Sequence, residues 1–99
     1  MEALIKKDGK SLCVTVSGKL DSLTSTELEK KLKENFDGIS ELVFDFSGLE
    51  YISSAGLRVL LGSHKTMAAK GGVMTVKNAN ESIVDIFTIT GMITIFNME

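Results

Sequence analysis

Cysteine and histidine are nearly absent from this sequence. Cys13 and His64 are the single residues of their kinds among 99 residues, so an internal disulfide is excluded and a zinc site built from histidine and cysteine has too few ligands. No aspartate partner for His64 is evident, which argues against a Ser-His catalytic pair. We therefore expect a binding protein without enzymatic activity, metal or cofactor. The alternating pattern around Cys13 predicts a small core residue.

Long runs of one residue class are also missing. The 11 lysine and arginine residues are scattered among 13 acidic ones, with a net charge of -2, so the basic stripe that nucleic-acid binding requires is absent. No apolar run approaches the ~20 residues that span a bilayer, and the first residues lack the apolar region of a signal peptide. We expect one cytoplasmic domain over residues 1–99 that has no membrane span and does not contact nucleic acid directly.

Strand patterns recur along the whole chain. Asp8-Gly9 is a tight-turn signal that joins the first two strands into a hairpin, and Gly18 interrupts the pattern of the second. The almost continuous apolar run at 42–46 is typical of a central strand that is covered on both faces. The predicted strands cover residues 3–7, 12–17, 42–46, 73–76 and 93–96.

Helical patterns separate the later strands. The first helix is predicted to be capped by Thr24, with Glu27 three residues later completing a capping box. The second follows a Ser-Ser pair and ends at Gly71-Gly72, and the third is capped by Asn80. Strands that alternate with helices predict an α/β fold. We expect a mixed, mostly parallel β-sheet of about five strands, backed by three to four helices.

Ser53 and Ser54 lie where the central strand is predicted to meet the second helix. In open α/β sheets, ligands and functional groups collect at the carboxyl ends of the strands. Serine there is either a structural cap or a phosphate site, because the start of a helix accepts both a capping oxygen and negative charge. Gly56 has two readings as well: it leaves room for the backbone of another molecule, or it relieves crowding against the sheet.

Enzymatic readings of this segment have little support. Ile52 stands where a G-x-S-x-G nucleophile elbow needs glycine. Asp21 and Asp45 both lie near predicted strand ends and could approach each other, but two carboxylates without a surrounding motif are a weak signal of catalysis.

The stretch "FDFSGLEYISSAGLRVLL" at residues 44–61 resembles the signature of the STAS domain of bacterial anti-sigma factor antagonists. In that signature an Asp-x-Ser strand end leads through an aromatic and an aliphatic residue to a serine, a small residue, Gly and Leu. The resemblance extends to "VSGKLDSLTSTELEKKL", "KGGVMTV" and "IFTITGMITIF". It therefore covers nearly the whole chain, in the order of elements expected above.

The resemblance implies a partner-switching mechanism. An unphosphorylated antagonist binds an anti-sigma factor that is also a serine kinase, and the kinase releases its sigma factor. The kinase then phosphorylates the antagonist, and a serine phosphatase resets the switch. Ser54 matches the phosphoacceptor and Asp21 matches an acidic residue near it. Ser53 stands where many members have aspartate, which makes Ser53 the second candidate for the phosphate.

The switch is physically reasonable, because a phosphate adds about -1.5 to -2 charges to a surface that must be buried against a partner. The alternative is a STAS module that senses a small ligand or scaffolds a signalling complex, with Ser54 serving only as a cap or ligand contact. In the first reading the loop with Ser22 and Leu23 lies beside the phosphoacceptor. The expected partner-binding residues are Asp21, Ser22, Leu23, Ser53, Ser54, Gly56 and Arg58.

Overall fold

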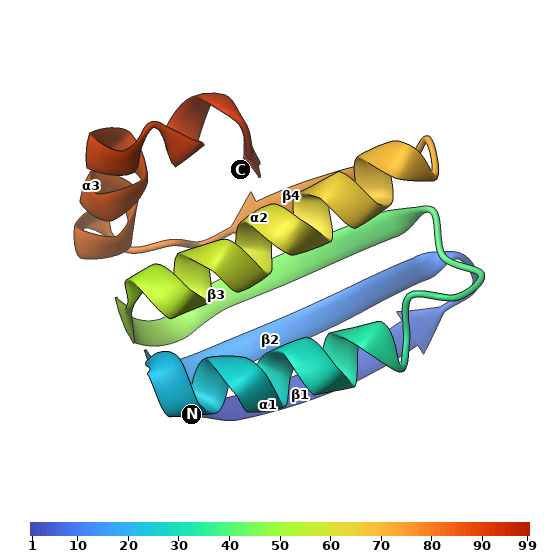
Figure 1. The fold of residues 1–99 in the computed structure, drawn as a ribbon, viewed down its shortest axis with the longest axis horizontal. Helices are drawn as coiled ribbons and strands as arrows, with labels where there is room; N and C mark the ends of the chain where they lie inside the picture. The colour runs from blue at the N-terminus through green and yellow to red at the C-terminus, as the bar shows by residue number, and fades with distance from the viewer.

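The computed structural model describes residues 1–99 as an α/β fold in which one sheet is backed by helices (Figure 1). The predicted fold class is confirmed: the sheet has five strands and the chain has three α-helices. In chain order the elements are β1 (Glu2–Asp8), β2 (Ser11–Leu20), α1 (Ser22–Lys33), β3 (Glu41–Ile52), α2 (Ser54–Ala69), β4 (Val73–Lys77), α3 (Glu81–Thr90), a 3-10 helix (Met92–Thr94) and β5 (Asn97–Met98).

The strands lie in the order β1-β2-β3-β4-β5, so β3 is central as expected. Only β1 and β2 pair antiparallel; the other neighbours are parallel. Parallel neighbouring strands are joined by right-handed crossover connections. When successive strands are added in one direction across the sheet, these crossovers lie on the same face. Accordingly α1 and α2 lie side by side on one face in Figure 1. None of the helices is long and apolar enough to cross a membrane.

The core lies between the sheet and these helices. Alternate residues of β2 and β3 point toward the helices and are buried, because side chains in a strand alternate between faces. Leu28 and Leu32 of α1 and Leu60 and Met67 of α2 cover them. Phe96 closes the end of the core, packing edge to face on Phe87 with ring centroids 5.4 Å apart.

Cys13 is not a core residue, contrary to the prediction. Leu12 and Val14 are fully buried on the helix side of β2, so Cys13 between them faces the opposite side of the sheet, where it is half-buried. Its neighbours across the strands are Lys6 and Val43. The alternation was read correctly, but the face that carries Cys13 has no helix over it.

The first helix begins three residues earlier than predicted. Its N-cap is Asp21, and Thr24 closes a capping box with Asp21 rather than with Glu27. The shift follows from β2, which continues past Gly18 to Leu20. Gly18 has a φ of 81° and lies at a shift in the β2–β3 register, a backbone conformation that glycine adopts without steric cost.

The prediction of a last strand at residues 93–96 is wrong. Gly91 ends α3 in the left-handed conformation with a φ of 80°, and the chain then forms the 3-10 helix, in which the Ile95 N–H donates to the Met92 carbonyl. Burial of Phe96 holds this turn against the core. The strand β5 therefore comes later and consists of Asn97 and Met98 alone, which pair with Thr75 and Val76.

Candidate functional site

The carboxyl ends of β2 and β3 bring the starts of α1 and α2 together. Leu20 and Ile52 are register partners at these ends, and the Ser53 N–H donates to the Leu20 carbonyl at 2.9 Å. The next residue along β2 is Asp21, the N-cap of α1, and Ser53 itself is the N-cap of α2. We call this edge, with Asp21, Ser53 and Ser54, the paired helix starts.

Ser53 and Ser54 have different environments. Ser53 caps α2, and its hydroxyl accepts a hydrogen bond from the Gly56 N–H at 3.2 Å. Ser54 is the first residue of α2 and is exposed, and its hydroxyl has no hydrogen-bond partner within the protein. Ser53 therefore has the structural role of the cap, and the Ser54 hydroxyl remains free.

Asp21 is held as a charged cap. Its carboxylate accepts hydrogen bonds from the backbone N–H groups of Leu23 at 3.1 Å and Thr24 at 2.9 Å. The pKa of Asp21 lies below its ordinary value of 3.8, chiefly because of the Thr24 backbone hydrogen bond, with a side-chain hydrogen bond from Thr24 next. The charged cap thus stabilises the fold above pH 3.8, and this contribution is lost as the pH falls through the lowered pKa.

Gly56 is buried, which disfavours its expected contact with a partner. A methyl group at this position would lie 2.7 Å from Ile52 Cγ1 and 3.1 Å from Leu20 Cδ2. The glycine therefore lets α2 approach the ends of β2 and β3, which is the second of the two roles inferred from the sequence. Its contribution to the paired helix starts is to set the position of Ser53 and Ser54.

Ser22 and Leu23 are in the first turn of α1, not in a loop, because the helix begins at Ser22. Ser22 and Arg58 line one open hollow of about 200 Å³ between α1 and α2. Leu23 is 75% exposed, a large value for an apolar side chain. Arg58 is also exposed and has no acidic partner, since the only side-chain ion pair joins Lys33 and Glu29 at 3.7 Å.

Tyr51 is an exposed residue of this edge that the sequence analysis did not single out. It lies beside Lys19 in the β2–β3 register and is 47% exposed. The alternation of side chains along β3 is the pattern that indicates its exposure: Ile52 is buried, so the side chain of Tyr51 faces the other side of the sheet. An aromatic group three residues before Ser54 adds apolar surface near the paired helix starts.

The carboxylates Asp21 and Asp45 do not form a pair. Asp45 lies inside β3, beside Thr15 and Lys77 in the register, and its carboxylate accepts hydrogen bonds from the Ser47 N–H at 3.0 Å and from the Asn78 amide at 3.2 Å. These two bonds, with that of Ser47 first, hold the pKa of Asp45 below its ordinary value of 3.8. No group of three or more His, Cys, Asp or Glu residues is placed to hold a metal ion.

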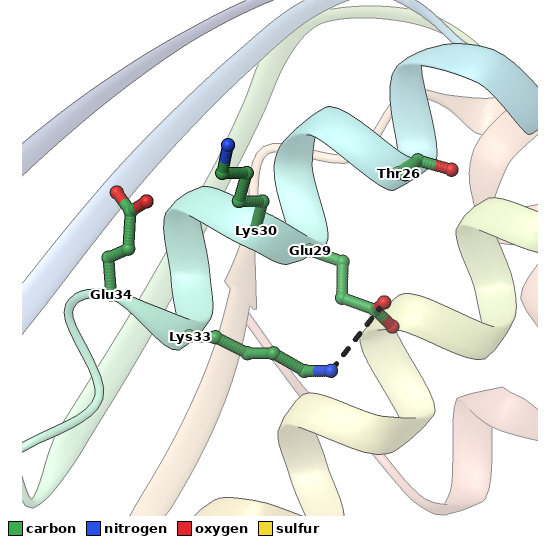
Figure 2. A pocket seen from close by; sticks show the side chains of 5 residues that line it. All are labelled: Thr26, Glu29, Lys30, Lys33 and Glu34. Atoms are coloured by element: carbon green, nitrogen blue, oxygen red, sulfur yellow. Dashed lines mark ion pairs between the residues drawn. The ribbon is translucent and has the colours of Figure 1, made fainter.

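Polar residues predominate among the residues that line the hollows on the surface. Figure 2 shows one on α1, in which Glu29 and Lys33 point toward each other while the other side chains point in different directions. Its lining contains no hydrophobic residue: Thr26, Glu29, Lys30, Lys33 and Glu34. Sites for small molecules are usually concave and largely apolar, so this hollow gives no support to the ligand-sensing alternative.

Known proteins share both the sequence pattern and the fold. The STAS domain family matches residues 2–99. The anti-sigma-B factor antagonist of Bacillus subtilis (strain 168) is 26% identical over 88 residues, which cover 89% of this chain and 81% of that protein. The anti-sigma F factor antagonist of Paenibacillus polymyxa is 30% identical over 83 residues, which cover 82% of this chain and 71% of that protein.

Solved structures of SpoIIAA, an anti-sigma factor antagonist, have the same fold. The unphosphorylated form has a TM-score of 0.81 at 15% identity, covering 99% of this chain and 87% of that one. The phosphorylated form, described as a Bacillus cell fate determinant, has a TM-score of 0.80 at 15% identity, covering 99% of this chain and 91% of that one. At this level of identity the likeness concerns the fold alone.

Proposed function

This chain belongs to the STAS domain family of anti-sigma factor antagonists, and we propose that it binds an anti-sigma factor that is also a serine kinase and releases it when Ser54 is phosphorylated. Binding frees the sigma factor, and a serine phosphatase restores the unphosphorylated form. In this proposal the chain acts as a binding partner and as the substrate of the kinase, and the kinase supplies the catalytic groups. Because the kinase uses ATP, the proposed switch operates in the cytoplasm.

The free hydroxyl of Ser54 carries this proposal. Ser53 already caps α2, so Ser54 can be modified without loss of the cap. The start of a helix has unpaired N–H groups and a partial positive charge, both of which favour a phosphate at the first helical residue. Phosphorylation is therefore compatible with the folded chain.

The same phosphate opposes a partner at this surface. Asp21, at the same edge, is held in its charged form, and a phosphate adds about -1.5 to -2 further charges. A partner surface that accepts the single charge of Asp21 is then faced with about three negative charges. A loss of ~3 kcal/mol in binding lowers the affinity by roughly two orders of magnitude, which is enough for a switch.

No change of fold is needed for this mechanism. The two forms of SpoIIAA, unphosphorylated and phosphorylated, match this chain with TM-scores of 0.81 and 0.80. A common fold in both states of that protein supports a switch that acts through surface charge. We infer that the contact surface includes Ser54, Arg58, Ser22 and the exposed side chain of Leu23.

The test combines the purified chain with ATP and the candidate serine-kinase anti-sigma factor from the same genome. Mass spectrometry should locate one phosphate on Ser54, and the modified chain should no longer be retained by the immobilised kinase. Ser53→Ala keeps the acceptor and should still be phosphorylated. Ser54→Ala should bind the kinase and stay bound in the presence of ATP.

Other outcomes would reject specific parts of the proposal. Phosphate on Ser53 with none on Ser54 would reassign the acceptor. Binding without phosphate would leave an antagonist that is not switched at this site. If the kinase neither binds nor modifies the chain, the antagonist role itself fails.

A further inference from the structure

We propose that β1 pairs antiparallel with β1 of a second copy of this chain, so that two copies share one continuous sheet. β1 is the outermost strand of the sheet and has a partner only on its β2 side. In Figure 1 it runs along the margin of the sheet with no element beyond it. The opposite edge is β5, whose two residues are too few for extended pairing. An unpaired strand edge is a template for another strand.

The side chains of β1 on the open face of the sheet form an ordered row. Glu2, Leu4 and Lys6 are all exposed and are register partners of the β2 residues that face away from the helices. Leu4 is 67% exposed. An apolar side chain thus lies between a negative and a positive one along the same free edge.

One register makes this row complementary to itself. In an antiparallel pair centred on Leu4, Glu2 lies opposite Lys6 of the second copy, Lys6 lies opposite Glu2, and Leu4 lies opposite Leu4. On the helix side, Ala3 lies opposite Ile5. Opposite charges and apolar pairs that face each other across strands stabilise a sheet. The two-fold symmetry repeats each favourable pair.

Neighbouring registers lack this match. Centring on Ile5 puts Glu2 opposite Asp8 and Leu4 opposite Lys6, which sets like charges together and leaves the leucine against a cation. Centring on Ala3 puts Glu2 opposite Leu4. Centring between two residues sets the exposed row of one copy against the helix-facing row of the other, because the side-chain period is two.

Lysine on an edge strand ordinarily prevents pairing by bringing like charges together. Here Lys6 meets Glu2 instead, so the usual protection does not act in the register centred on Leu4. The helix above this edge, α1, presents no block of one charge either. Two acids and two bases line one hollow on it: Glu27, Lys30, Lys31 and Glu34.

The first experiment measures association by sedimentation equilibrium over a range of concentrations. The wild-type chain should dimerise, and Glu2→Lys or Lys6→Glu should each weaken the dimer about tenfold or more, because two symmetric attractive pairs become repulsive. The charge swap Glu2→Lys with Lys6→Glu should restore the dimer. A wild-type chain that stays monomeric at ~1 mM, where even weak pairs associate, rejects the proposal.

A second experiment fixes the register. In a Cys13→Ser background, Ala3→Cys, Leu4→Cys and Ile5→Cys are oxidised separately after circular dichroism has shown that each is folded. Directly opposite Cβ atoms lie about 4.5–5.5 Å apart, near the reach of a disulfide. Only Leu4→Cys should give a cross-linked dimer. Cross-linking strongest at position 3 or 5, or equal at all three, overturns the register. None of these positions lies at the paired helix starts, so the result is independent of the Ser54 switch.

Discussion

Asp21 illustrates how a single residue of this site serves both the fold and the surface. Its carboxylate holds the first turn of α1 through the backbone N–H groups of Leu23 and Thr24. The same hydrogen bonds keep it ionised, so the charge that a partner meets is a consequence of the cap. Ser53 and Ser54 separate these roles instead: one hydroxyl caps α2 and the other is free.

We predict that Asp21→Ala and Asp21→Asn differ in stability. Alanine cannot accept the Leu23 and Thr24 hydrogen bonds, whereas the asparagine side-chain oxygen can. Asp21→Ala should therefore lower the urea midpoint at neutral pH and Asp21→Asn should change it little. Below pH 3.8 the wild type loses its charged cap, so its midpoint should fall relative to that of Asp21→Asn. Equal midpoints for the two variants at neutral pH would contradict the cap.

At the scale of elements, two glycines of α2, Gly56 and Gly62, have opposite surroundings. At Gly56 the helix lies close against the sheet, and an added methyl group there would overlap Ile52 and Leu20. Gly62 is exposed, and an added methyl group there would meet nothing within 4 Å. Both residues carry the usual cost of glycine in a helix, but only Gly56 gains packing in return.

Alanine at these two positions should therefore act in opposite directions. We expect Gly56→Ala to lower the free energy of unfolding by about 1–3 kcal/mol through overpacking, and Gly62→Ala to raise it by about 0.5–1 kcal/mol through helix propensity. Urea denaturation monitored by circular dichroism measures both. If Gly56→Ala is as stable as the wild type, the close contact with Ile52 does not limit the fold.

At the scale of the whole molecule, the sheet topology brings together two helix caps, Asp21 and Ser53, that are 32 residues apart in the sequence. Parallel pairing of β2 with β3 puts their carboxyl ends at one edge, and the crossovers carry α1 and α2 back over the same face. The site thus rests on the paired carboxyl ends of β2 and β3, so we expect a charge added there to change the surface rather than the architecture.

We predict that Ser54→Asp separates binding from folding. A negative charge at the first residue of α2 favours the helix dipole, so the free energy of unfolding should rise by about 0.3–1 kcal/mol or stay unchanged. Affinity for the anti-sigma factor should fall at the same time, as measured by calorimetry, whereas Ser54→Asn, matched in size, should retain more binding. A loss of stability in Ser54→Asp would mean that the charge acts through the fold.

The sequence by itself determined the fold class, the central strand, the tight turn that follows Asp8 and the Asn80 cap of α3, because each depends on local periodicity or on a residue with a strong local preference. The serine pair was also located correctly at the start of α2. Local signals were enough for all of these features.

Tertiary structure decided what local signals left open. Which of Ser53 and Ser54 caps α2 depends on the backbone direction at the end of β3, and the role of Gly56 depends on Leu20 and Ile52, which approach it from the sheet. The last strand was misplaced because burial of Phe96 outweighs the β propensity of its neighbours. Side-chain contacts between distant segments are the physical reason in each case, and a local pattern does not contain them.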